Sequence, residues 1–144
     1  MLADDPLGVQ REKLTEPPPS SYHAAFEAIS CDPNNELVVV EDHDGSVVAV
    51  LQITYMPHIT YQGGWRAAIE GVRVASHMRG SGGSKNLFAW AIARASARGC
   101  HVVQLTTDKQ RPEAKRLYES MGFVATPEGM RLILDPRNAT NPEN

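Results

Sequence analysis

The sequence predicts an α/β fold: a mixed, largely antiparallel sheet flanked by helices, with a central parallel strand pair. Three observations indicate this class. Two β-branched runs are joined by a short Asp-His-Asp-Gly segment, which is typical of a hairpin. A long helical pattern then stands between two strand-like runs, and such a crossover makes those strands parallel. Two more short runs near the C-terminus predict a second hairpin.

Length and composition indicate the number of domains and the class of protein. The chain has 144 residues, of which 42% are hydrophobic, so we expect one domain over residues 1–136 and a flexible tail at 137–144. A net charge of −3, without any run of Lys or Arg, disfavours nucleic acid and membrane surfaces as partners. Only two cysteines and no apolar leader or membrane-spanning run predict a cytoplasmic protein.

The first helix follows a proline-rich breaker, TEPPPSS. Tyr22, Phe26 and Ile29 recur at helical spacing after it, and Ser20 or Ser21 is the candidate N-cap. The segment CDPNN ends this helix.

Three antiparallel strands come next. The runs ELVVVE and SVVAVLQITY predict the hairpin, and a third strand is expected at roughly Trp65 to Val74. A helix from Ser84 to Arg98 follows, with Gly99 as its C′ residue. Its apolar stripe consists of Leu87, Phe88, Ala91, Ile92 and Ala95.

The last part of the chain predicts a strand, a helix and a hairpin. HVVQLTT is a strand pattern, and Pro112 fits the first turn of a helix that stops at Gly122. FVAT and MRLIL predict the closing hairpin. The basic residues in ARASARG and KRLYE are expected on solvated helix faces.

A glycine-rich turn from Arg79 to Ser84 leads into the long helix. A strand, a glycine-rich turn and a helix N-terminus together form an anion site, because free N–H groups and the helix dipole point outward there. A Walker loop does not fit, since Ser84 rather than glycine precedes Lys85. A dinucleotide fingerprint fails too, because its third glycine falls at Lys85.

Two motifs together resemble the GNAT superfamily of acyl-CoA-dependent N-acetyltransferases. The first is Arg-x-x-Gly-x-small after Val-x-Val, carried by Arg79, Gly82 and Ser84. The second is RPEAKRLYESMGF, with a tyrosine before Gly-Phe. The resemblance covers about Glu36 to Leu134 and implies a GNAT-like sheet. Members usually begin with a strand and a helix before the segment that resembles LADDPLG. Either the start of this sequence is assigned too late or the protein lacks that first strand, and in the second case an exposed edge is expected at ELVVVE.

The resemblance implies acetyl-CoA (coenzyme A) as co-substrate and no metal. It places the pyrophosphate at the glycine-rich turn and pairs the pantetheine arm with the third strand. Arg111 stands where many members carry an asparagine that contacts this arm, and its guanidinium could instead reach a phosphate. The expected cofactor-binding residues are Val72, Arg73, Val74, Arg79, Gly80, Ser81, Gly82, Gly83, Ser84 and Arg111.

Two residues are candidates for proton transfer. Tyr118 is expected to protonate the departing thiolate, and the alternative is a core tyrosine that covers the sheet. Glu70 is the candidate base for the amine, because strand alternation puts Glu70, Val72 and Val74 on one face. The alternative for Glu70 is a solvated acid or a partner of Arg66. Gly71 marks either a β-bulge or a plain glycine in the strand.

The resemblance implies that the acceptor is a primary amine of a small molecule or peptide, and the sequence leaves a homodimer open. The five histidines do not fall at metal-ligand spacing. His58, with Tyr55, Tyr61 and Trp65, lies where the resemblance implies the acceptor pocket, and the alternative for His58 is a surface or packed residue. The alternative function is a non-catalytic CoA-binding regulatory or interaction domain. A nucleotide hydrolase is disfavoured, because neither a Walker lysine nor an acidic metal cluster follows the turn.

Overall fold

The chain divides into two units, Met1–Leu105 and Thr106–Asn144. The computed structural model describes residues 8–9, 12–80, 82–126 and 128–134. Ser81 of the glycine-rich turn and the predicted tail at 137–144 lie outside the described residues. No helix in those described ranges has both the length and the apolar composition needed to cross a bilayer.

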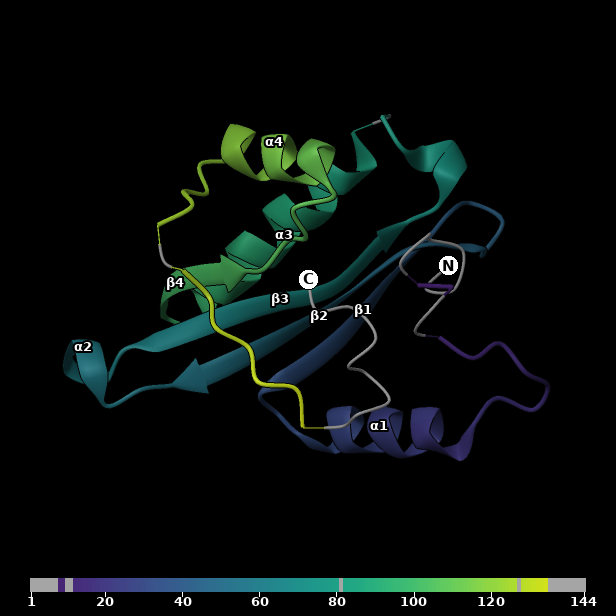
Figure 1. Ribbon diagram of the computed structural model, residues 1–144, viewed down its shortest axis with the longest axis horizontal. Helices are drawn as coiled ribbons and strands as arrows, with labels where there is room; N and C mark the ends of the chain where they lie inside the picture. The colour runs from purple at the N-terminus through teal and green to yellow at the C-terminus, as the bar shows by residue number, and fades with distance from the viewer. Residues whose placement is uncertain (1–7, 10–11, 81, 127, 135–144) are drawn as a thin grey trace. The chain divides into compact units, whose positions relative to one another are not determined.

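The first unit contains a four-stranded sheet in the order β1-β2-β3-β4 (Figure 1). Its elements are α1 (Ser20–Cys31), β1 (Asn35–Glu41), β2 (Val47–Pro57), α2 (Thr60–Gly63), β3 (Trp65–Val74), η2 (Ser76–Met78), α3 (Gly83–Ala97) and β4 (Cys100–Leu105). The first three strands are antiparallel, and β4 runs parallel to β3. The predicted mixed sheet, with its parallel pair joined through a helix, is therefore confirmed.

Helix α1 starts one position earlier than its expected serine caps allow. Its N-cap is Pro19, which has φ −52° and ψ 138°, and no side chain caps the helix. The prediction of Ser20 or Ser21 as the N-cap was therefore wrong. The prolines hold the chain extended up to Pro19, so the helix begins at the first residue after them.

The core lies between α3 and one face of the sheet. Alternate residues of β2 and β3 point into it, among them Leu51, Ile53 and Ile69, which are at most 2% exposed. Strand alternation explains this set, since every second side chain faces the helix. From α3 come the buried residues Leu87, Phe88, Ala91 and Ala95. Ile92, also predicted for this stripe, is half-buried.

The other face of the sheet is only partly covered. Figure 1 shows α1 on the side of the sheet opposite α3, and none of its residues is buried. Within the described residues β1 forms one edge of the sheet, as expected for ELVVVE. Leu37 and Val39 of β1 remain 42% and 49% exposed.

A polar cluster joins α3 to β1 and β2. Arg94 of α3 makes an ion pair with Glu36 of β1, with Nη2 3.0 Å from Oε1. Tyr55 of β2 donates its hydroxyl proton to the same carboxylate. The guanidinium of Arg98 lies 4.0 Å from the centre of the Tyr55 ring, and its Nη1 donates to the Pro33 carbonyl. Arg94 is exposed, as predicted for the basic residues of ARASARG, although it also pairs with Glu36. Arg98 is half-buried, so the prediction of a solvated face was wrong for Arg98.

The second unit contains α4 (Pro112–Ser120). Pro112 stands in its first turn, and Gly122 follows its end with φ +92°, as predicted. The predicted closing hairpin is absent from the described residues 123–126 and 128–134. Val124 and Leu132 are 75% and 84% exposed there. An alternating pattern shows that a segment can form a strand. The segment becomes a strand only where a partner strand pairs with it.

Candidate functional site: an open strand edge and a glycine-rich turn

The parallel pairing of β3 and β4 ends halfway along β3. The last paired residues are Ile69 and Leu105, whereas β3 continues to Val74 beside β2. In the described part of the chain, the side of β3 turned away from β2 therefore has no strand neighbour beyond Ile69. The backbone groups on this side of β3 have no strand partner among the described residues, so an extended ligand could pair with them as a strand does.

A β-bulge at Gly71 marks the point where the two strands separate. Gln52 of β2 pairs with Glu70, and Val50 pairs with Arg73, so two steps on β2 match three on β3. Gly71 has φ +62°, a left-handed conformation that suits glycine. Of the two interpretations of Gly71, the structure therefore shows the bulge.

This bulge corrects the expected direction of Glu70. Directly paired residues of antiparallel strands share a face, so Glu70 and Arg73 lie on one face with Gln52 and Val50. Val74 pairs with Ala49, which is buried on the face toward α3. Glu70 and Val74 thus lie on opposite faces, and the prediction that they share one was wrong, because counting by two does not register the extra residue.

Two arginines cover the free carbonyl groups of β3. The Val72 carbonyl accepts a hydrogen bond of 2.7 Å from Arg73 Nη1. The Val74 carbonyl accepts one of 3.2 Å from Arg79 Nε. These contacts give each carbonyl a side-chain donor at the end of β3. They also bring Arg79 of the glycine-rich turn back to the strand end, a contact that the sequence pattern did not indicate.

The glycine-rich turn delivers the chain into α3. After η2, Gly80 has φ +81° and Gly82 has φ +89°, and a Cβ atom added at either position would meet nothing within 4 Å. Gly82 is the N-cap of α3 and provides no side-chain acceptor for the first-turn N–H groups, which begin at Gly83 and Ser84. These N–H groups therefore remain available to a ligand.

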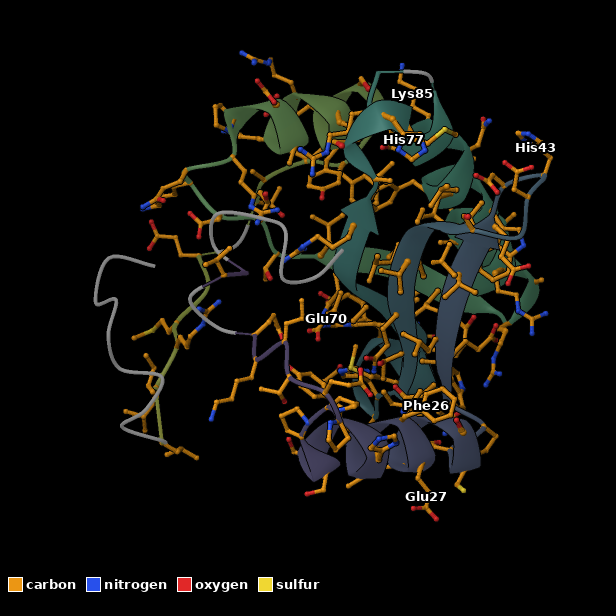
Figure 2. All side chains as sticks on the ribbon, turned by 90° about the vertical axis from the view of Figure 1, so that its right-hand side faces the viewer. Phe26, Glu27, His43, Glu70, His77 and Lys85 are labelled. Carbon is orange, nitrogen blue, oxygen red and sulfur yellow. The ribbon has the colours of Figure 1, made fainter. Side chains whose placement is uncertain are left out.

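The charge at this turn favours an anion. The helix N-terminus carries a partial positive charge, and the exposed side chain of Arg79 adds a full one. Figure 2 shows Lys85 and His77 at the same end of the first unit, and both are exposed. Sequence reasoning used Lys85 only to exclude other loops. Its position just after the small residue of the motif was the signal that it stands at the mouth of the turn.

Glu70 is exposed on the face of the sheet opposite α3. Its cross-strand neighbour Gln52 donates to Asn35 Oδ1 over 3.1 Å, and Thr54 donates to the same atom over 2.6 Å. No ion pair joins Glu70 to Arg66, because Arg66 instead stacks on Tyr61 with its Cζ atom 5.0 Å from the ring centre. In the described residues, the interpretation of Glu70 as a partner of Arg66 thus finds no support.

The second unit carries Arg111 and Tyr118 on the same helix. Arg111 is the N-cap residue of α4 and is half-buried. Tyr118 is also half-buried, and its ring makes an edge contact with Phe123 at 6.1 Å between centroids. The Tyr118 carbonyl accepts hydrogen bonds from the N–H groups of Met121 and Phe123, which close the helix.

One group of potential metal ligands occurs in the described residues. Asp42, His43 and Asp44 lie in the turn between β1 and β2 with ligand atoms within 4.8 Å of one another. The Asp42 carboxylate accepts hydrogen bonds from the backbone N–H groups of Asp44 and Ser46. These bonds explain the arrangement as a hairpin turn.

Comparisons with known proteins identify the fold and the family. A family model described as "Acetyltransferase (GNAT) family" matches residues 7–123. A solved structure of a transcriptional regulator from Bacillus halodurans C-125 is 53% identical, covers 93% of this chain and 89% of its own, and has a TM-score of 0.89. A putative acetyltransferase from Agrobacterium tumefaciens is 28% identical, with coverage of 78% and 77% and a TM-score of 0.72.

A more distant structure shares the fold. Glucosamine-6-phosphate N-acetyltransferase from Arabidopsis thaliana is 23% identical, covers 81% of this chain and 78% of its own, and has a TM-score of 0.70. None of the curated proteins matches this chain. The family match extends from before α1 to the end of α4 and includes the open edge of β3 and the glycine-rich turn. The chain therefore belongs to the GNAT family of acetyltransferases.

Proposed function

We propose that this protein transfers an acetyl group from acetyl-CoA directly to a primary amine of a small molecule or peptide. The observation that carries the proposal is the unpaired edge of β3 from Glu70 to Val74, which leads straight into the glycine-rich turn. Acetyl-CoA is the acyl donor of this family and supplies an activated thioester. An extended amide chain ending in a pyrophosphate matches a strand edge followed by a helix N-terminus.

The residues present fit this co-substrate. We assign its phosphates to the first-turn N–H groups of α3, with the charge of Arg79 and the open space at Gly80 and Gly82. We also assign the phosphates to Gly83, Ser81 and Ser84 of the turn. We propose Arg111 as an additional phosphate ligand. The backbone of Val72 to Val74 is assigned to the pantetheine amides. Guanidinium groups already bind the Val72 and Val74 carbonyls, and ligand N–H groups either use the second lone pair of each oxygen or displace Arg73 and Arg79.

Two side chains are assigned to proton transfer. The amine nitrogen forms a bond to the thioester carbon as the carbon–sulfur bond breaks, so the nitrogen loses a proton and the sulfur gains one. We assign acceptance of the amine proton to Glu70, directly or through a water, because it is an exposed carboxylate beside the strand bulge. We assign donation to the sulfur to Tyr118, whose phenol has a suitable proton affinity.

Acetyl-CoA binding is tested by thermal unfolding. A ligand that binds only the folded protein raises the melting temperature as its concentration exceeds Kd. We expect this rise in the unaltered protein and its loss in Gly82→Trp, which puts a ring into the turn. Gly45→Trp is the matched control, because Gly45 also has a positive φ, +77°, with open space around it, but lies in the β1–β2 hairpin. An unchanged melting temperature in the unaltered, well-folded protein contradicts the proposal.

A second candidate function is a non-catalytic, CoA-binding regulatory domain. The observation that favours it is the 53% identity to the Bacillus halodurans protein described as a transcriptional regulator. Release of free thiol from acetyl-CoA across a panel of amines separates the two functions. Turnover supports the transferase, whereas a thermal shift without turnover supports the regulatory domain.

We also infer the setting of this activity. Cys31 and Cys100 are free, which suits a reducing compartment such as the cytoplasm. A net charge of −3 favours small-molecule or peptide acceptors over nucleic acid and anionic membranes. A homodimer is compatible with the exposed edge of β1.

A further inference from the structure

We propose that the acceptor amine carries an acid group, a carboxylate or a phosphate, which binds to a cluster formed by Arg66, Tyr61 and His101. This inference rests on the proposed transferase function and names the class of acceptor. The acid cluster, as we call these three residues, comes from the start of β3, the short helix α2 and β4. The glycine-rich turn, to which we assign the phosphates, lies beyond the other end of β3. These three side chains therefore have no part in that site.

Arg66 provides the first argument. Its Nε atom is buried without a hydrogen-bond partner. The described residues give Arg66 no ion pair, and its guanidinium instead lies 5.0 Å from the centre of the Tyr61 ring. A buried donor without an acceptor is destabilising, because it has lost its hydrogen bond to water. A carboxylate or phosphate oxygen is the acceptor that a guanidinium binds best, so an anionic ligand would remove this cost.

Backbone strain provides the second argument. Tyr61 and Gln62 are consecutive non-glycine residues with φ +54° and +60°. Each such conformation is strained and persists only where the surroundings impose it. Here the strain presents the Tyr61 ring, which is 70% exposed, between Arg66 and His101. The centroids of the Tyr61 and His101 rings are 5.2 Å apart.

The approach of His101 provides the third argument. Trp65 pairs with Cys100 and Arg66 pairs with Val102, so His101 is an extra residue in β4. A Cβ atom on Gly64 would lie 2.5 Å from His101 Nδ1, so the glycine leaves the space that the imidazole occupies. A bulge that re-aims a side chain is common beside functional sites. The imidazole provides a second group that can donate a hydrogen bond to an acid.

The position of the acid cluster relates it to Glu70. Arg66, Ala68 and Glu70 alternate along β3 and share the face opposite α3, since Ala67 and Ile69 are buried against the helix. The Cα atoms of Arg66 and Glu70 are ~13 Å apart, because the two residues are four positions apart in an extended strand. The small side chain of Ala68 leaves room between them. Thr54 and Gln52, the cross-strand neighbours of Ala68 and Glu70, make this strip polar.

The strip therefore suits a molecule with an amine at one end and an acid at the other. The amine would meet Glu70 and the acid would meet Arg66. A diamine would put a cation beside the guanidinium, which is unfavourable, and a simple alkylamine would leave the Arg66 donor unpaired.

Four probes of one chain length test this proposal: 6-aminohexanoate, 6-aminohexyl phosphate, hexylamine and 1,6-diaminohexane. We expect the two acids to bind in calorimetry and, with acetyl-CoA, to give kcat/KM values at least about 10-fold above hexylamine, the gain of a charge-assisted hydrogen bond. The diamine should be the poorest. The order of the two acids tells carboxylate from phosphate recognition. Equal values for all four probes contradict the proposal.

Variants assign the preference to Arg66. Arg66→Met approximates the length of the side chain without its charge. It should lower the affinity for the two acids, and their kcat/KM values, about 10-fold or more. The kcat/KM for hexylamine and the KM for acetyl-CoA should stay the same. Arg66→Lys should retain part of the preference. Arg116→Met on α4 removes the same charge from an exposed position and should have no effect. If Arg66→Met behaves like Arg116→Met, the acid cluster is only a stacking arrangement and the inference is wrong.

The two proposals fail in different ways. If no probe is acetylated but the acids still bind through Arg66, the transferase function fails and the acid site stands. If hexylamine is acetylated as well as the acids are, the transferase function stands and the acid site fails. Melting temperatures of each variant show whether a loss of binding reflects unfolding instead.

Discussion

The Tyr55 hydroxyl donates a hydrogen bond of 3.1 Å to Oε1 of Glu36 across neighbouring strands. Tyr55 is only 1% exposed. Burial, and then the hydrogen bond to Glu36, raise the pKa of Tyr55 from 10.0 to about 12. Since the folded-state pKa is raised, the neutral phenol stabilises the fold fully below pH 10, and this contribution is lost as the pH rises toward 12.

Alkaline denaturation should therefore depend on Tyr55. We expect the unaltered protein to lose stability between pH 10 and 12 by up to about 2 kcal/mol more than Tyr55→Phe does, because phenylalanine has no proton to lose. Urea unfolding followed by circular dichroism at several pH values in this window measures the difference. Parallel stability curves for the two proteins would show that the phenol does not ionise with unfolding.

The ion pair between Glu36 and Arg94 predicts a second effect on stability. Glu36→Ala removes the partner of Arg94 and leaves the buried Tyr55 hydroxyl without its acceptor. We expect a loss of about 1–3 kcal/mol in the free energy of unfolding. Glu27→Ala is the control, because Glu27 points away from the sheet in Figure 2 and should change stability by less than about 0.5 kcal/mol. Equal losses in the two variants would contradict a specific contribution from the Glu36 cluster.

The bulge at Gly71 predicts a loss of stability combined with a loss of cofactor affinity. Gly71→Ala meets no atom within 4 Å but forces a Cβ residue to adopt φ +62°, which costs about 1 kcal/mol. Gly45→Ala incurs the same strain at φ +77° in the β1–β2 hairpin. Both variants should be destabilised alike in urea, whereas only Gly71→Ala should raise the KM for acetyl-CoA. A raised KM in both would show that general loosening is responsible.

The sequence predicted most of the helices and strands because their ends carry strong local signals. The strand expected at Trp65 to Val74 has these bounds in the structure, since two glycines precede it and the turn follows it. The long helix was expected to begin one residue later than it does and to end at Arg98, next to Gly99. The closing hairpin was not found in the described residues, because a strand needs a partner that local sequence does not specify.

The details of the candidate site depend on features that the periodic pattern of apolar residues does not indicate. The side of the sheet on which Glu70 lies is set by the single extra residue at Gly71. Arg94 and Glu36 are 58 residues apart, and nothing in a helix pattern indicates that the strand offers a carboxylate to that arginine. The strain at Tyr61 and Gln62 is likewise imposed by the fold, since neither residue type prefers a positive φ.

Removal of the Glu70 carboxylate should slow acetyl transfer without weakening acetyl-CoA binding. In Glu70→Gln we expect kcat/KM for the amine to fall about 10²-fold, the usual contribution of a general base. The loss should shrink as the pH rises, because more of the amine is then already neutral. Thiol release measured from pH 7 to 10 tests this, with thermal shift as the binding check. A uniform loss at every pH would point to a role in positioning the acceptor instead.

Tyr118 allows the sharpest test of the proposed chemistry. Tyr118→Phe keeps the ring and its edge contact with Phe123, and the melting temperature of the variant shows whether the hydroxyl also supports the fold. If the hydroxyl protonates the departing sulfur, kcat should fall about 10²-fold while the thermal shift by acetyl-CoA stays the same. An acetyl thioester with a more acidic thiol needs less protonation as it leaves, so such a donor should recover much of the lost rate in Tyr118→Phe. If the variant is equally slow with both donors, or as fast as the unaltered protein, the sulfur takes its proton from another source and Tyr118 covers the helix face as a packing residue.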